Sequence, residues 1–72
     1  MSPNKLMYFR KAAGKTQKDM ASALHISESA YSKKERGCGQ FKPKEIILTA
    51  QELNLDSAQV NEIFFENKLP NG

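Results

Sequence analysis

The sequence contains very little of what a disulfide framework, a metal site or a membrane anchor requires. It has one cysteine, Cys38, so no disulfide can form within the chain and a cysteine-rich tetrahedral zinc site is excluded. It also has one histidine, His25, and therefore no second histidine to complete a metal pair. Because no run of about 20 apolar residues exists, we expect neither a transmembrane helix nor a signal peptide. A lone thiol without a disulfide suits a reducing cytoplasm.

The residue arrangements on which catalysis depends are also missing. A catalytic site needs a nucleophile with a positioned base, paired carboxylates in a cleft, or a loop that cradles phosphates. The segment Gly37-Cys38-Gly39 is rich in glycine, but it does not lead into a helix as a nucleotide-binding loop does. A chain of 72 residues also has little volume for a pocket. We therefore predict that the protein is not an enzyme and uses no cofactor, no metal ion and no small-molecule substrate.

Positive charge is concentrated in the first part of the chain. Residues 1–44 contain ten Lys or Arg against three Asp or Glu, a net charge of +7. Residues 45–72 contain one Lys against five Asp or Glu, a net charge of −4, and the two parts sum to the overall +3. Such a division is expected when one face of a domain meets a polyanion and the other does not. A solvated surface with a chance asymmetry is the alternative, and charge alone leaves both interpretations open.

Start and stop residues divide the chain into five short helical segments and no strand. Ser, Thr or Asp at N-cap positions, Pro in a first turn and Gly after a last turn mark the boundaries. The expected segments run from Ser2 or Asn4 to Gly14, from Thr16 through Leu24, from Glu28 to Glu35, from Pro43 through Leu53, and from Asp56 or Ser57 through Phe64. The apolar stripes include Ala13 in the first segment and Ile47 in the fourth. The predicted fold is all-α, a compact five-helix bundle formed by residues 1–66, with a frayed tail over 67–72.

The second and third segments have the spacing of a helix-turn-helix. Two short helices joined by a turn of three or four residues cross at a steep angle, so the crossing point needs a small side chain, which Ala21 provides. His25 falls in the turn, where a left-handed backbone is often required and Gly is usual. Ile26 is expected to close the junction, and Phe41 to fold back from the following loop.

One face of the third segment is polar, although the helix beside it is apolar. Glu28, Ser29, Ser32 and Lys33 stand at positions i, i+1, i+4 and i+5, which share one helical face. A helix that serves only the core would not carry these four residues together. An exposed helix whose N-terminal residues point outward has the dimensions to enter the major groove of DNA.

At this point the chain resembles the Cro/repressor helix-turn-helix family, often called the XRE family. The residues that carry the resemblance are Gln17, Met20, Ala21, Leu24, Ile26, Ser27, Tyr31, Ser32, Glu35, Arg36 and Gly37. The segments PKEIILTAQELNL and VNEIFFE also resemble the fourth and fifth helices of that family, so the likeness covers about residues 5–66. It implies a lambda-repressor-like DNA-binding domain. Within the family, the size and the ending EIFFE resemble small phage proteins of the Cro or modulator-of-repression kind.

The resemblance implies a role for individual residues. In that family, the start of the second helix holds a DNA phosphate, the third helix reaches base edges, and basic residues after it contact the DNA backbone. The matching DNA-binding residues are Gln17 with Lys18 beside it, then Glu28, Ser29, Ser32 and Lys33 for bases, and Arg36 and Lys42 for phosphates. Arg10 and Glu35 match an ion pair that ties the first helix to the end of the third, and we expect this pair to be structural.

Glu28 is unusual in a helix that enters DNA, because a carboxylate near phosphates is unfavourable unless it accepts from a cytosine amino group. It opens a second hypothesis, in which the protein is an antirepressor or co-repressor that binds a phage repressor through the same face. The residues of that face are Gln17, Glu28, Ser29, Ser32 and Lys33. The expected partner is thus a double-stranded DNA operator, on which two copies can pair, or a repressor from the same regulatory module. The expected location is the cytoplasm of a bacterial host cell, with no membrane partner.

Overall fold

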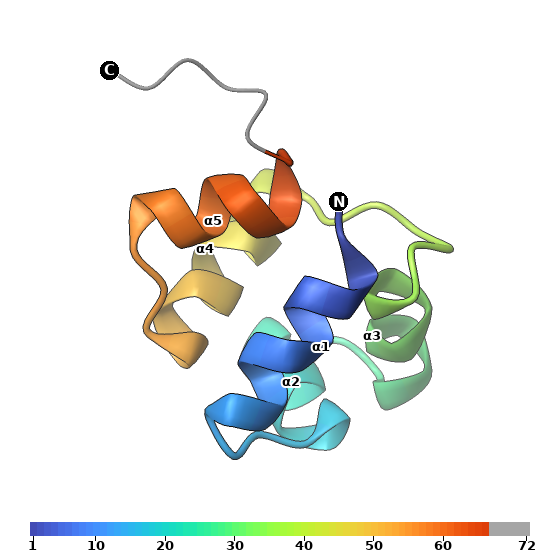
Figure 1. Ribbon diagram of the computed structural model, residues 1–72. Helices are drawn as coiled ribbons and strands as arrows, with labels where there is room; N and C mark the ends of the chain where they lie inside the picture. Colours follow the sequence, from blue (N-terminus) through green and yellow to red (C-terminus); the bar gives the residue numbers. More distant parts are fainter. Residues whose placement is uncertain (67–72) are drawn as a thin grey trace.

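The computed structural model describes residues 1–66, and these residues fold into five α-helices with no β-strand among them (Figure 1). The helices are α1 (Pro3–Ala12), α2 (Gln17–Leu24), α3 (Glu28–Glu35), α4 (Pro43–Leu53) and α5 (Ser57–Phe64). The predicted all-α class and the five predicted segments are therefore confirmed. The tail predicted to fray, residues 67–72, lies outside the described residues.

Side-chain caps set the starts of α2 and α3. Thr16 Oγ1 accepts from the backbone N–H of Asp19 at 3.0 Å, and Asp19 Oδ2 accepts from the backbone N–H of Thr16 at 2.9 Å. The hydrogen bond that the Thr16 backbone donates to the Asp19 carboxylate, together with one from the Thr16 side chain, lowers the pKa of Asp19 below its ordinary value. Ser27 Oγ accepts from the backbone N–H of Ala30 at 3.1 Å. Each cap satisfies a backbone N–H that the first turn of a helix leaves unpaired. The predicted starts of both helices are therefore confirmed.

The turn between α2 and α3 uses the left-handed conformation that the sequence predicted. His25 has φ 60° and ψ 39°, a region that residues other than glycine seldom occupy. Its backbone N–H donates to the carbonyl of Ser22 at 3.2 Å, and the N–H of Ile26 donates to the carbonyl of Ala21 at 3.0 Å. These two bonds close the end of α2 and redirect the chain into α3 within a few residues.

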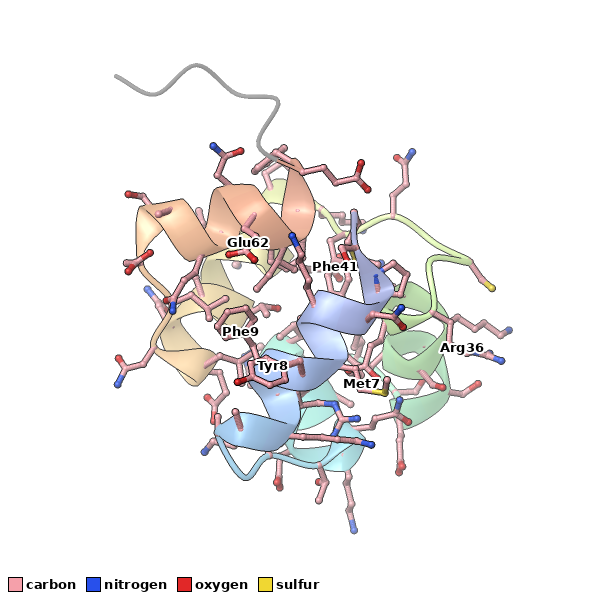
Figure 2. The ribbon with its side chains drawn as sticks, viewed as in Figure 1. Met7, Tyr8, Phe9, Arg36, Phe41 and Glu62 are labelled. Atoms are coloured by element: carbon pink, nitrogen blue, oxygen red, sulfur yellow. The ribbon has the colours of Figure 1, made fainter. Side chains whose placement is uncertain are left out.

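The core is a single cluster of apolar side chains contributed by all five helices. Its buried members are Leu6, Met20, Ala21, Leu24, Tyr31, Leu53, Ile63 and Phe64. Phe41 folds back from the loop before α4, as predicted, and its ring meets those of Tyr31 at 6.2 Å and Phe64 at 5.2 Å in edge-to-face geometry. Figure 2 shows Phe41 turned toward the interior. One aromatic side chain from a loop therefore links α3 to α5.

Two apolar residues assigned to the core by the sequence are on the surface instead. Ile47 is 58% exposed, because the inward face of α4 is formed by Glu45, Thr49 and Leu53. A residue two positions after Glu45 points to the opposite side of a helix with 3.6 residues per turn. Ala13 is exposed because it is the C-cap of α1, beyond the last helical residue. The predictions for these two positions were wrong, because apolar character alone fixes neither the side of α4 that faces inward nor the residue at which α1 ends.

The packing of the helices leaves the outer side of α3 open. α3 packs against α2 and α1, and α5 packs against α1 and α4, so α3 and α5 lie at different sides of the molecule (Figure 1). The N–H of Ser2 donates to the carbonyl of Ile63 at 2.7 Å, which fixes the start of α1 beside the end of α5. None of the helices within residues 1–66 has the length and apolar character that crossing a membrane requires.

Candidate nucleic-acid interface

The outer face of α3 carries four polar side chains that have no partners among residues 1–66. Glu28, Ser29 and Lys33 are exposed, and Ser32 is half-buried. Within residues 1–66, none of these four side chains makes a hydrogen bond or an ion pair with another residue. The structure thus places all four predicted base-reading residues on one open helical face, with their polar groups available to a ligand. We call this set the α3 outer face.

The inner side of α3 carries a buried ion pair that joins this helix to α1. Arg10 Nε donates to Glu35 Oε1 at 2.6 Å, and Arg10 Nη2 donates to Glu35 Oε2 at 3.5 Å. The two side chains are only 8% and 4% exposed. Arg10 Nη1 also donates to the carbonyl of Lys15 at 2.8 Å, where the chain enters α2. The ion pair implied by the family resemblance is present, and it ties the end of α3 to α1 and to the start of α2.

Tyr31 adds a third group to this pair. Its hydroxyl donates to Glu35 Oε1 at 3.2 Å, and its side chain is fully buried. Burial raises the pKa of Tyr31 far above its ordinary value, and the negative charge of Glu35 raises it further. The phenol therefore keeps its proton and remains a donor. Glu35 in turn is satisfied on both oxygens, as a buried carboxylate must be.

Gln17, predicted to contact a phosphate, is held by the same carboxylate. Its Nε2 donates to Glu35 Oε2 at 2.6 Å, and the residue is half-buried. Because a carboxylate only accepts, the amide nitrogen must face Glu35, and one of its two N–H groups is used. The second N–H and the carbonyl oxygen remain for a ligand. Gln17 therefore joins a buried network at the first residue of α2, a connection that sequence spacing did not reveal.

The three predicted cationic contacts to the DNA backbone lie around α3. Lys18 is exposed on α2, where its positive charge lies near Asp19 and contributes to lowering the pKa of that carboxyl. Arg36 is exposed at the end of α3, where its Nε donates to the carbonyl of Ser32 at 3.3 Å, and Figure 2 shows its guanidinium extending away from the body. Lys42 is exposed immediately before α4, so its ammonium group is accessible from solvent. All three cations can reach an anionic ligand.

A second ion pair, which the spacing of residues did not predict, fixes the loop that carries Lys42. Lys34 Nζ donates to Glu45 Oε1 at 3.0 Å and to the carbonyl of Gln40 at 2.9 Å. Glu45 Oε1 also accepts from the backbone N–H of Lys42 at 2.8 Å. A glutamate three residues after an N-cap is a capping pattern that could have indicated this position of Glu45. The loop between α3 and α4 is thereby fixed to both helices.

The Lys34–Glu45 pair makes stability depend on pH. Burial raises the pKa of Glu45, but hydrogen bonds from Lys42 and Lys34 outweigh it, and the net pKa lies below the ordinary value. A depressed folded-state pKa stabilises the fold above the unfolded pKa, and this stabilisation is lost as pH falls through the folded pKa. Glu45→Gln is therefore expected to cost about 1–3 kcal/mol at pH 7 and progressively less as pH falls from about 5 to 3.

Urea unfolding followed by circular dichroism at several pH values measures this convergence. Glu62→Gln is the matched control, because Glu62 pairs with Lys5 at 3.2 Å on the surface, where both side chains are more than a third exposed. That variant is expected to change stability by less than about 1 kcal/mol. A constant difference between Glu45→Gln and the unmodified protein across this pH range would contradict the assignment.

The remaining polar residues of the region do not assemble a metal site. Among residues 1–66, no three side chains of His, Cys, Asp or Glu gather in a way that could hold a metal ion. Cys38 is an exposed free thiol in the loop after α3. The groups that the described structure brings together on one side are therefore hydroxyls, an amide, lysines, an arginine and one carboxylate.

Comparison with known protein families agrees with this geometry. A family model described as helix-turn-helix matches residues 6–61, from the first turns of α1 into α5. Neither a curated protein nor a solved structure matches the chain. The matched range contains the buried network, the α3 outer face and the three surrounding cations.

Proposed function

The chain belongs to the XRE-type helix-turn-helix family of DNA-binding regulators, and on this basis we propose that it is a sequence-specific regulator of transcription on double-stranded DNA. The observation that carries the proposal is the α3 outer face, whose four polar side chains are free of partners within residues 1–66. In this proposal α3 enters the major groove, and the side chains of its outer face contact base edges.

The dimensions and charges of this region suit such a complex. An α-helix with its side chains is about 10–12 Å in diameter, which fits a major groove about 12 Å wide, and α3 has eight residues to lie along it. Gln17, Lys18, Arg36 and Lys42 surround α3 and are the proposed phosphate contacts, which set the position of the helix without reading sequence. Ser29 and Lys33 then read bases, with Lys33 preferring the acceptors of guanine.

A domain of this size reads one half-site, so affinity must come from two copies. In the proposed complex two copies pair on the operator with their α3 helices about 34–36 Å apart, one turn of the duplex. The resemblance of the segment EIFFE, residues 62–66, to small phage proteins of the Cro kind supports a phage-type repressor. A regulator of this kind acts on DNA in the cytoplasm of a bacterial host.

A second candidate function is favoured by the free carboxylate of Glu28. A negative charge on the α3 outer face can pair with an arginine or lysine on the DNA-binding surface of another regulator, which that contact would block. The protein would then be an antirepressor or co-repressor that uses Gln17, Glu28, Ser29, Ser32 and Lys33 toward a protein partner. DNA binding has the stronger support, because three exposed cations, Lys18, Arg36 and Lys42, surround the same face.

Fluorescence anisotropy across a salt series tests the proposal, with the duplex upstream of the protein's own coding sequence and a scrambled duplex of equal composition. We expect the native duplex to bind at least about 10³-fold more tightly than the scrambled one. With Lys18, Arg36 and Lys42 on phosphates, log K should fall against log salt with a slope of about −3 per bound copy. Weak binding of equal strength to both duplexes would reject this function in favour of the protein partner.

A further inference from the structure

Glu28 stands apart from every other acidic residue of the chain. The sequence contains eight Asp and Glu, all within the described residues 1–66. Six of the others have named partners: caps at Asp19, Glu45 and Asp56, the buried network at Glu35, and surface ion pairs at Glu52 and Glu62. Glu66 pairs with the N-terminal ammonium at 3.2 Å. Within residues 1–66, Glu28 alone has neither a hydrogen bond nor an ion pair for its carboxylate.

The spacing of residues on α3 explains why this charge stays free. On a helix, a carboxylate pairs with a cation three or four positions away, and those positions after Glu28 hold Tyr31 and Ser32. Lys33 is five positions after Glu28, one position beyond the spacing at which such pairs form. The N-terminus of α3 accommodates a negative charge because its backbone N–H groups point toward it, so the fold tolerates Glu28 without using it. If this face contacts DNA, the free carboxylate of Glu28 needs a hydrogen-bond donor on the DNA.

The major groove offers amino donors on two bases, and they are not equivalent for a carboxylate. Adenine presents its N6 amino group beside the N7 acceptor, which would face the second oxygen of a carboxylate and repel it. Cytosine presents its N4 amino group without an acceptor of its own in the groove, so it only donates. Phosphates repel the charge as well. The ligand group that best complements Glu28 is thus the N4 amino group of a cytosine.

Building on the proposed DNA-binding function, we propose that Glu28 selects a cytosine in the half-site by accepting a hydrogen bond from its N4 amino group. The position of this cytosine follows from α3 itself. Glu28 and Lys33 are five residues apart, which is about 7.5 Å along a helix axis, close to two base-pair steps of about 3.4 Å each. With α3 lying along the groove, the cytosine read by Glu28 and the guanine read by Lys33 stand two steps apart.

Selection from a randomised duplex library tests this assignment, using the full chain, Glu28→Gln and the surface control Glu62→Gln. The unmodified protein and Glu62→Gln should enrich the same half-site, with a cytosine two steps from a guanine. Glu28→Gln should enrich adenine at the cytosine position and leave the other positions unchanged, because a glutamine amide both donates to N7 and accepts from N6. Replacing that C·G pair by T·A in the selected duplex should weaken the unmodified protein about tenfold.

The outcomes separate this inference from the function on which it rests. If the unmodified protein and Glu28→Gln both enrich the same half-site, Glu28 contacts no base. Sequence-specific DNA binding would still be supported in that case. If the unmodified protein enriches no sequence at all, the DNA-binding proposal fails and the inference fails with it. Glu28 would in that case be reassigned to a cationic group on a protein partner. Circular dichroism spectra of the three proteins should coincide, because Glu28 is exposed and the side chain of Glu62 is more than a third exposed. Coincident spectra exclude unfolding as the cause.

Discussion

Replacing Glu35 by alanine is expected to destabilise the protein by about 3–5 kcal/mol, because it leaves a buried guanidinium without its counter-charge. Arg10 Nε lies 2.6 Å from Glu35 Oε1, and the Arg10 side chain is only 8% exposed. At this depth little solvent is available to replace the lost carboxylate. Tyr31 and Gln17 lose their acceptor in the same substitution. A domain of 72 residues has a total stability of roughly 4–11 kcal/mol, so the variant should be close to unfolding at 25 °C.

Urea unfolding measures this loss, and two variants show that it comes from the buried pair. Glu62→Ala removes an exposed carboxylate that pairs with Lys5 at 3.2 Å, and it should cost less than about 1 kcal/mol. The double variant Arg10→Met/Glu35→Leu removes both charges and replaces them with apolar side chains. It should regain the stability that the unpaired guanidinium costs, while Tyr31 and Gln17 still lack their acceptor. A Glu35→Ala variant no less stable than Glu62→Ala would show that the network does not hold α3 in place.

The helices could be predicted from sequence because their boundaries are encoded locally. Thr16 with Asp19, Ser27 and Pro43 each act within one turn of their own helix, and all of them start helices where expected. His25 likewise closes α2 in the left-handed conformation that its place in the turn indicated. Information of this kind needs no knowledge of the rest of the chain.

The contacts between helices were harder to predict, because they depend on rotation about each helix axis. The apolar character of Ile47 predicts a place in the core, but α4 turns Thr49 inward and leaves Ile47 exposed. The Lys34–Glu45 pair, which fastens the loop between α3 and α4, joins residues eleven positions apart and has no periodic signature. The Arg10–Glu35 pair, separated by 25 positions, was predicted only through the family resemblance.

The α3 outer face occupies an intermediate position between these cases. Its four residues share one side of a helix by spacing alone, so their grouping was predictable. That this side is the open one depends on the opposite side, where Tyr31 and Glu35 are buried against α1 and α2. Gln17 shows the limit of the sequence pattern, because its hydrogen bond to Glu35 links the proposed phosphate contact directly to the buried network. The side of α3 on which each residue lies could be predicted from sequence. The hydrogen bond of Gln17 to the carboxylate of Glu35 could not.

Lys33→Ala is expected to weaken binding to the specific duplex by about 1–3 kcal/mol while barely changing binding to a scrambled duplex. Lys33 is exposed and, within residues 1–66, its side chain has no partner, so its removal should not unfold α3. In the proposed complex its ammonium reaches the guanine acceptors in the groove, and this contact exists only where the guanine is present. The loss should therefore depend on sequence rather than on charge alone.

Arg36→Gln provides the comparison that separates base reading from phosphate contact, because it also removes one exposed positive charge near α3. Arg36 is a proposed phosphate contact, so its replacement should weaken binding to both duplexes by a similar factor and reduce the salt slope by about 0.9 per copy. Anisotropy titrations of both variants on both duplexes, at several salt concentrations, measure the difference. If Lys33→Ala weakened binding to the two duplexes by the same factor, Lys33 would be a phosphate contact too. Base recognition would then depend on the remaining residues of the α3 outer face.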